Sequence, residues 1–152
     1  MHMSRDAEIA YVASLIGKPW AINGYGPDLY GCWGLFVVVQ QALFARMLPK
    51  VEVSDQRGSK KVSAQQRMYV EIARAIADHP VRKEWVQVEE PEHGCAVLMS
   101  RIHVPAHIGV YLNYDGGSVL HADEEHGVVF EDIPRLRARQ WMGITFYKYV
   151  GP

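Results

Sequence analysis

The chain has 152 residues, of which 49% are hydrophobic and 22% charged, and its formal net charge is -1. This length and hydrophobic content fit one globular domain with a substantial core, so we expect a single domain over residues 1–152. The balanced charge argues against a polybasic surface for nucleic acid or an anionic membrane, and neither partner is expected. Two cysteines cannot build a disulfide framework, so an oxidising compartment is not required; a single Cys32–Cys95 bridge is the less favoured alternative.

The N-terminal residues do not have the pattern of a secretory leader. Arg5, Asp6 and Glu8 precede only a short apolar stretch, and no apolar run in the chain reaches the length of a membrane span. We therefore expect synthesis in the cytoplasm without a signal peptide.

A first helix is predicted to begin after Ser4, which can cap it, and to end at Gly17. Its apolar stripe recurs at helical spacing and comprises Ile9, Val12, Ala13 and Ile16. The segment that follows, through Gly31, is irregular and rich in glycine.

The rest of the chain is organised around Cys32, where this glycine-rich segment meets an apolar run. The run over 32–48 suits a buried central helix that ends at Pro49, although Val37–Val39 alone favours a strand. Near a helix start, unpaired N–H groups and the helix dipole favour a thiolate, which predicts a lowered pKa for Cys32 and makes it a candidate nucleophile. The alternative is that Cys32 is a small buried hydrophobe.

Beyond Pro49, residues 50–61 are predicted to form an exposed loop and residues 63–79 a helix with a capping box at Ser63 and Gln66. The pattern then changes to short strands, predicted over 84–88, 95–99, 107–112, 118–122, 127–130 and 144–150, with helical turns within 133–142. Helices followed by a run of strands predict an α+β fold.

Two histidines on neighbouring strands are candidates for the base that a cysteine nucleophile needs. A three-residue turn over 114–116, with its glycine in the left-handed conformation, places His121 opposite Gly109 and on the same sheet face as His107. A two-residue turn over 115–116 sends the histidines to opposite faces. In the first register His107 can act as the base and His121 can bond its other nitrogen.

Three sequence blocks resemble the NlpC/P60 family of papain-like cysteine peptidases, and most closely its phage-tail and prophage members. The blocks are Gly26–Leu35 around the cysteine, Gly94–Met99, and Ala106–Leu112 followed by Val119–Ala122. The resemblance extends from about Gly17 to Tyr149.

The resemblance implies a papain-like core, with the cysteine-bearing helix packed on an antiparallel sheet of about five strands. It implies Cys32 as nucleophile, His107 as base and His121 as the residue that orients His107. The substrate it implies is a peptidoglycan stem peptide, cut between D-glutamate and a diamino acid, with no cofactor and no metal. Trp20 stands where the family often has an aromatic residue, and Gly31 and Trp33 flank the nucleophile as candidate substrate-binding positions. Trp33 and Trp141 are otherwise expected to be core residues.

The sequence departs from the family pattern at Gly31 and Cys95, two positions where aspartate is usual. In related enzymes the residues beside the nucleophile help recognise the substrate amine, so this recognition is not carried over to Gly31. Asp28 and Glu52 are candidate substitutes.

Other functions compete with the peptidase interpretation. A zinc site of Cys95, His103, His107 and His121 is disfavoured, because the spacing is irregular and Cys32 would have no role. The arginines at 135, 137 and 139 are expected to form a solvated face, with contact to anionic wall polymer as the lesser alternative.

On the resemblance we expect a tail-associated enzyme that acts at the cell wall and binds phage tail proteins. The rivals are a tail-tip structural protein with little activity and an injected antibacterial effector.

Overall fold

The computed structural model describes residues 3–51 and 80–152. The predicted α+β class is confirmed, with six strands in one antiparallel sheet of order β1-β6-β2-β3-β4-β5. In chain order the elements are α1 (Arg5–Leu15), α2 (Cys32–Phe44), η1 (Pro80–Glu84), β1 (Trp85–Val88), β2 (Ala96–Arg101), β3 (Val104–Leu112), η2 (Tyr114–Gly116), β4 (Ser118–Asp123), β5 (Gly127–Glu131), α4 (Ile133–Ala138) and β6 (Met142–Tyr149). Most of the predicted 50–61 loop and the whole predicted 63–79 helix lie outside the described residues.

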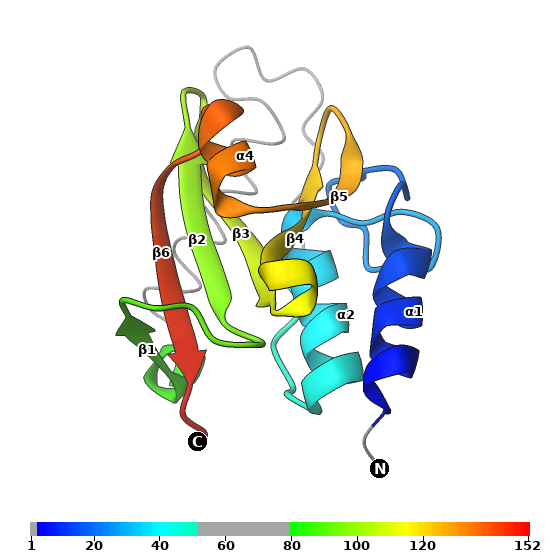
Figure 1. Ribbon diagram of the computed structural model, residues 1–152, viewed down its shortest axis with the longest axis vertical. Helices are drawn as coiled ribbons and strands as arrows, with labels where there is room; N and C mark the ends of the chain where they lie inside the picture. Colours follow the sequence, from blue (N-terminus) through cyan, green and yellow to red (C-terminus); the bar gives the residue numbers. More distant parts are fainter. Residues whose placement is uncertain (1–2, 52–79) are drawn as a thin grey trace.

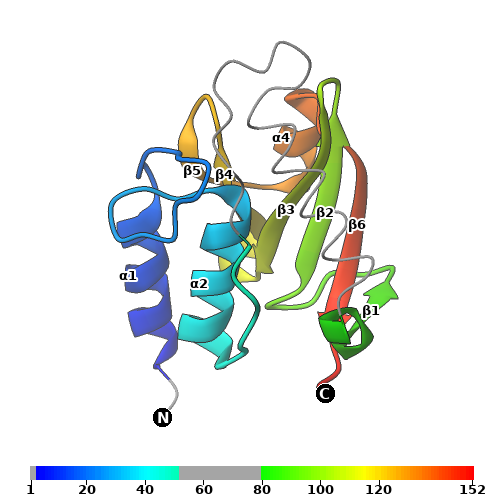
Figure 2. The same ribbon diagram turned by 180° about the vertical axis from the view of Figure 1, so that it is seen from behind.

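The sheet is covered on both faces. Figures 1 and 2 show α1 and α2 side by side next to the sheet, with α4 on the other side near β2 and β6. The larger core joins α2 to one strand face, which carries Ala96, Ile108, Val110, Leu112, Leu120 and Ala122. A smaller core lies beneath α4 on the opposite face and comprises Val97, Met99, Val119, Leu136 and Trp141. Successive strand residues therefore alternate between α2 and α4.

The first helix begins as predicted but ends at Leu15, two residues before Gly17, and its buried stripe is narrower than predicted. Ser4 caps α1 by accepting a hydrogen bond from the Ala7 N–H at 3.1 Å. Val12 is buried, whereas the predicted stripe is wrong at Ile9 and Ile16, which are 41% and 46% exposed, and at Ala13, which is also exposed. Only the side of α1 that meets the rest of the core is covered.

The central helix α2 starts at Cys32 as predicted but ends at Phe44, well before Pro49. Ala45 takes a left-handed conformation with φ 54°, and its N–H caps the Gln40 and Gln41 carbonyls. Burial on nearly all sides outweighs the strand preference of Val37–Val39. Within residues 3–51 and 80–152, no helix is long and apolar enough to span a membrane.

The β3–β4 hairpin has the three-residue turn that places both histidines on one face. The register pairs Leu112 with Ser118 and Val110 with Leu120. Extending the same register by one residue places His121 opposite Gly109. The turn is η2, in which both Asp115 and Gly116 have positive φ, at 51° and 84°. The alternative two-residue turn is thereby excluded.

Candidate active site

Cys32 occupies the first turn of α2, directly after the N-cap residue Gly31. Its side chain is only 1% exposed and belongs to the core between α2 and the sheet. Backbone N–H groups of Ile108, Trp33 and Cys32 itself point to the sulfur. The first of these groups belongs to the residue that follows His107, so the thiol lies against β3 beside the predicted base.

The predicted lowering of the Cys32 pKa is wrong for this structure. Burial raises the pKa of the Cys32 thiol to about 12, because desolvation outweighs the hydrogen bonds from the backbone N–H groups. Burial also lowers the pKa of His107 well below its usual range, helped by the neighbouring His121 and Arg101. The resting site thus holds a neutral thiol and a neutral imidazole.

This electrostatic state predicts slow alkylation of Cys32 at neutral pH. With a thiol pKa near 12, the thiolate fraction at pH 8 is about 10⁻⁴, and it rises about tenfold with each pH unit. Iodoacetamide labelling of the native protein from pH 5 to 10, followed by peptide mass spectrometry, measures this rate for Cys32 and Cys95 separately. A Cys32 rate that is fast and flat from pH 5 to 8 would reveal a preformed thiolate–imidazolium pair and contradict the expectation. The sequence-based ranking of Cys32 above Cys95 stays a prediction, which the same labelling measures.

The two predicted histidines are joined by a buried hydrogen bond. His107 Nε2 lies 2.9 Å from His121 Nδ1, and the two side chains are 1% and 0% exposed. The predicted contact between the two histidines is therefore present, and the orienting role of His121 toward Cys32 stays a prediction. Because Nε2 of His107 is engaged by His121, a base for Cys32 uses Nδ1.

His107 and Ile108 are neighbours on β3, and their side chains pack in different parts of the core. Ile108 packs in the core with α2, whereas His107 stacks on Trp141 on the α4 side, with ring centroids 4.4 Å apart. Catalytic hydrogen bonds in unliganded enzymes are often slack, and the direct Cys32–His107 contact stays a prediction.

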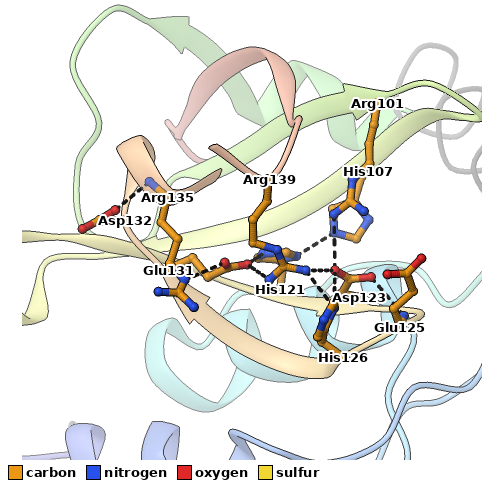
Figure 3. Close-up of polar contacts among 10 residues, drawn as sticks. All are labelled: Arg101, His107, His121, Asp123, Glu125, His126, Glu131, Asp132, Arg135 and Arg139. Atoms are coloured by element: carbon orange, nitrogen blue, oxygen red, sulfur yellow. Dashed lines mark hydrogen bonds and ion pairs between the residues drawn. The ribbon is translucent and has the colours of Figure 1, made fainter. Parts of the chain in front are cut away.

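A carboxylate that the sequence analysis did not single out completes the buried chain. Glu131 Oε1 lies 3.0 Å from His121 Nε2 and is 3% exposed (Figure 3). A register argument would have found Glu131, because β5 pairs Val129 with His121 and the residue two positions on points to the same face.

The prediction that the arginines at 135, 137 and 139 form a solvated face is wrong for Arg139. Its Nη1 donates to Glu131 at 2.8 Å and its Nη2 to Asp123 at 2.6 Å. Arg135 also reaches Glu131, at 3.2 Å, although its side chain is 70% exposed. Arg137 is exposed as predicted. The short helix α4 therefore delivers two arginines onto the carboxylate behind His121.

Trp141 shields the histidine pair from solvent. It is 2% exposed, stacks on His107 at an interplanar angle of 18° and meets His121 edge-on. Arg101 lies over its outer face, 3.8 Å from the ring centroid. The prediction that Trp141 is a core residue is confirmed. Its ring covers the imidazole of His107, the candidate base.

The three predicted substrate-binding positions lie in different environments. Trp33 is 4% exposed and donates Nε1–H to the Pro49 carbonyl at 2.9 Å, so its side chain belongs to the core. Trp20 is half-buried and packs on the larger core. The main chain of both Trp20 and Gly31 lies in the loop before α2, whose Tyr30 bridges to Trp20. Their contacts with substrate stay predictions.

The space beside Gly31 is filled by backbone. A Cβ on this residue would lie 2.8 Å from both the Ala21 and the Ile22 carbonyl oxygens. An aspartate therefore does not fit here without displacing the loop. Of the two candidate substitutes, Asp28 is exposed and Glu52 lies outside the described residues.

The Cys95 side chain takes part in a local turn and not in the candidate active site. Its sulfur accepts a hydrogen bond from the Glu92 N–H at 3.2 Å and so closes the turn before β2. Both cysteines are free thiols. Among the residues that the structure describes, no group of three or more histidine, cysteine or acidic side chains is arranged to hold a metal ion.

Comparison of the fold identifies its architecture. A solved structure titled "Crystal structure of NlpC/p60 domain of peptidoglycan hydrolase SagA" superposes with a TM-score of 0.52, covering 95% of this chain and 97% of that one at 16% identity. The chain has the NlpC/p60 fold. No protein-family profile matches the sequence, and no curated protein matches it. The NlpC/p60 fold that the sequence blocks imply is confirmed by this superposition.

Proposed function

We propose that this chain is an NlpC/P60 cysteine peptidase that hydrolyses peptidoglycan stem peptides between D-glutamate and a diamino acid. The observation that carries the proposal is the position of Cys32, at a helix start and against the peptide N–H that follows His107. His107 is in turn hydrogen-bonded to the buried His121. The fold neighbour is a domain of a peptidoglycan hydrolase, which supports the substrate class.

The proposed reaction is acyl transfer through a thioester. As the Cys32 sulfur attacks the amide carbon, its proton passes to Nδ1 of His107, and the N–H groups at the start of α2 can stabilise the oxyanion. The C–N bond then breaks and the proton goes to the departing amine. Water, deprotonated by His107, hydrolyses the thioester and restores the thiol.

We extend the proposal to a phage or prophage tail, because the sequence blocks resemble tail-associated members most closely. The protein would then be made in the cytoplasm, bind tail proteins and act at the cell wall. An injected antibacterial effector would carry the same chemistry. The buried, high-pKa thiol favours a different candidate, a tail-tip structural protein with little activity.

Digestion of purified peptidoglycan separates these candidates. The wild-type protein should release muropeptide fragments with new amino groups on the diamino acid, identified by mass spectrometry, whereas Cys32→Ala should release none. Intact peptidoglycan after prolonged incubation with wild-type protein would favour the structural candidate. Fragments with new termini elsewhere would overturn the proposed bond.

The crowded surroundings of Gly31 predict a further property of the enzyme. A charged hydrogen bond to a substrate ammonium is worth about 1.5–3 kcal/mol, or roughly 10-fold to 150-fold in discrimination. The atoms nearest to a Cβ at Gly31 belong to the neutral Ala21 and Ile22 carbonyls, and glycine has no carboxylate, so residue 31 cannot supply this bond. We expect kcat/KM for a free tripeptide and for a muropeptide that carries lactyl-muramic acid to agree within about tenfold. A preference of 100-fold or more for the free amine would contradict this.

A further inference from the structure

A buried chain of hydrogen bonds runs from the candidate base to a carboxylate two strands away. It passes from His107 Nε2 to His121 Nδ1 at 2.9 Å and from His121 Nε2 to Glu131 Oε1 at 3.0 Å. Each of the three side chains is 3% exposed or less. Figure 3 shows this chain crossing from β3 over β4 to β5. Water therefore has little access to the protons that connect these groups.

The carboxylate at the end of the chain is held as an acceptor. Glu131 receives Arg139 on Oε1 at 2.8 Å and Arg135 on Oε2 at 3.2 Å, besides His121. Burial raises the pKa of Glu131, but the hydrogen bonds from His121 and Arg139 outweigh it and lower the pKa to about 2. An ionised carboxylate has no proton to donate, so Nε2 of His121 must carry the hydrogen.

The ionised Glu131 carboxylate determines which nitrogen of each histidine carries the hydrogen. Burial lowers the pKa of His121 more than its contact with Glu131 raises it, so the ring is neutral and has one N–H. That N–H is used on Glu131, which leaves Nδ1 of His121 as an acceptor. His107 must then donate from Nε2, and the lone pair of its neutral ring is on Nδ1, the nitrogen that the proposed function assigns to the thiol proton.

We propose that Glu131 is a positioning residue that fixes both histidines as their Nε2–H tautomers and so directs the basic nitrogen of His107 to Cys32. This inference deepens the proposed function and rests on it for its catalytic meaning. The tautomer itself does not depend on the substrate. With the opposite tautomers, Nδ1 of His107 would carry a hydrogen and could not accept the thiol proton.

Charged groups from several elements surround this chain. Arg101 on β2 faces His107, while Arg139 and Arg135 on α4 face Glu131. Asp123 at the end of β4 receives both Arg101 and Arg139. These ion pairs hold Arg139 between the two carboxylates. The arrangement opposes protonation of Glu131 across the neutral pH range.

Histidine tautomers can be read directly by two-bond ¹H–¹⁵N spectra of the ¹⁵N-histidine-labelled full chain at pH 7. In the wild type, His107 and His121 should both show protonated Nε2 and unprotonated Nδ1. Glu131→Ala removes the acceptor, so Nδ1–H signals should appear for both rings. The kcat for peptidoglycan fragments should fall by about 10²-fold, with KM little changed.

Glu131→Gln is the conservative variant, because the amide oxygen can stay toward His121 while the amide nitrogen turns to the exposed Arg135. It should keep the wild-type tautomers and lose less than about tenfold in kcat. Glu90→Gln, at an exposed carboxylate, controls for the change in net charge and should alter neither readout.

Nδ1–H signals in the folded wild type would overturn the proposal, and so would unchanged tautomers in a folded Glu131→Ala. The expected tautomers in a protein that cleaves no peptidoglycan would instead overturn the proposed function while supporting the role of Glu131.

Discussion

Cys32→Ala is expected to lower peptidoglycan hydrolysis by about 10⁴-fold or more while the protein stays folded. The substitution removes the sulfur that forms the thioester in the proposed reaction, and an alanine side chain has no group that could attack the amide. The fold should persist because alanine keeps the apolar character of a position that is 1% exposed. The measurement is the rate of release of soluble fragments, with circular dichroism and thermal unfolding as checks on the fold.

Cys95→Ala is the matched control. Its side chain is 2% exposed, so the substitution also removes one buried sulfur, but that sulfur closes a turn through the Glu92 N–H. We expect a modest loss of stability and near-normal hydrolysis. If Cys32→Ala kept more than a tenth of the wild-type rate, or if Cys95→Ala were the inactive variant, Cys32 would not be the nucleophile.

Gly34→Ala is expected to have the largest effect on stability. A Cβ at Gly34 would overlap the carbonyl oxygen of Gly24, which the preceding loop lays across the first turn of α2. That same oxygen accepts a hydrogen bond from the Gly31 N–H at 2.9 Å, so it cannot simply move aside. Alanine favours a helix over glycine by about 1 kcal/mol, but the overlap should cost about 3 kcal/mol or more net.

Thermal unfolding measures this effect, and a loss of this size corresponds to a fall in Tm of roughly 10 °C for a chain of this length. Gly116→Ala serves as the control. Its φ of +84° is strained for alanine, but nothing lies within 4 Å of the added Cβ, so a cost of about 1–2 kcal/mol is expected. A Gly34→Ala protein as stable as the wild type would show that the loop does not press on α2 in solution.

Local patterns in the sequence predict much of the fold and the central members of the site. The Ser4 cap, the start of α2 at Cys32 and the strand alternation depend on neighbouring residues only, and each is confirmed. The pairing of His107 with His121 follows from one turn, because a turn of known length fixes which side chains share a face. The end of α2 was missed because the left-handed cap is an alanine, and left-handed caps are predicted from glycine or asparagine.

The tertiary structure alone decides the electrostatics of the site. Helix position predicts a lowered pKa for Cys32, yet the sheet that packs on α2 buries the sulfur and reverses the direction. The sequence predicts a solvated Arg139, but the position of α4 brings its guanidinium to Glu131.

The sequence by itself determined which residues carry the candidate chemistry, since Cys32, His107 and His121 are set by periodicity, turn length and resemblance. Their protonation states and the carboxylate behind them were decided by contacts between segments distant in the chain. The reason is physical: a turn or a helix start depends on adjacent residues, whereas desolvation and charge pairing depend on everything that packs around a group.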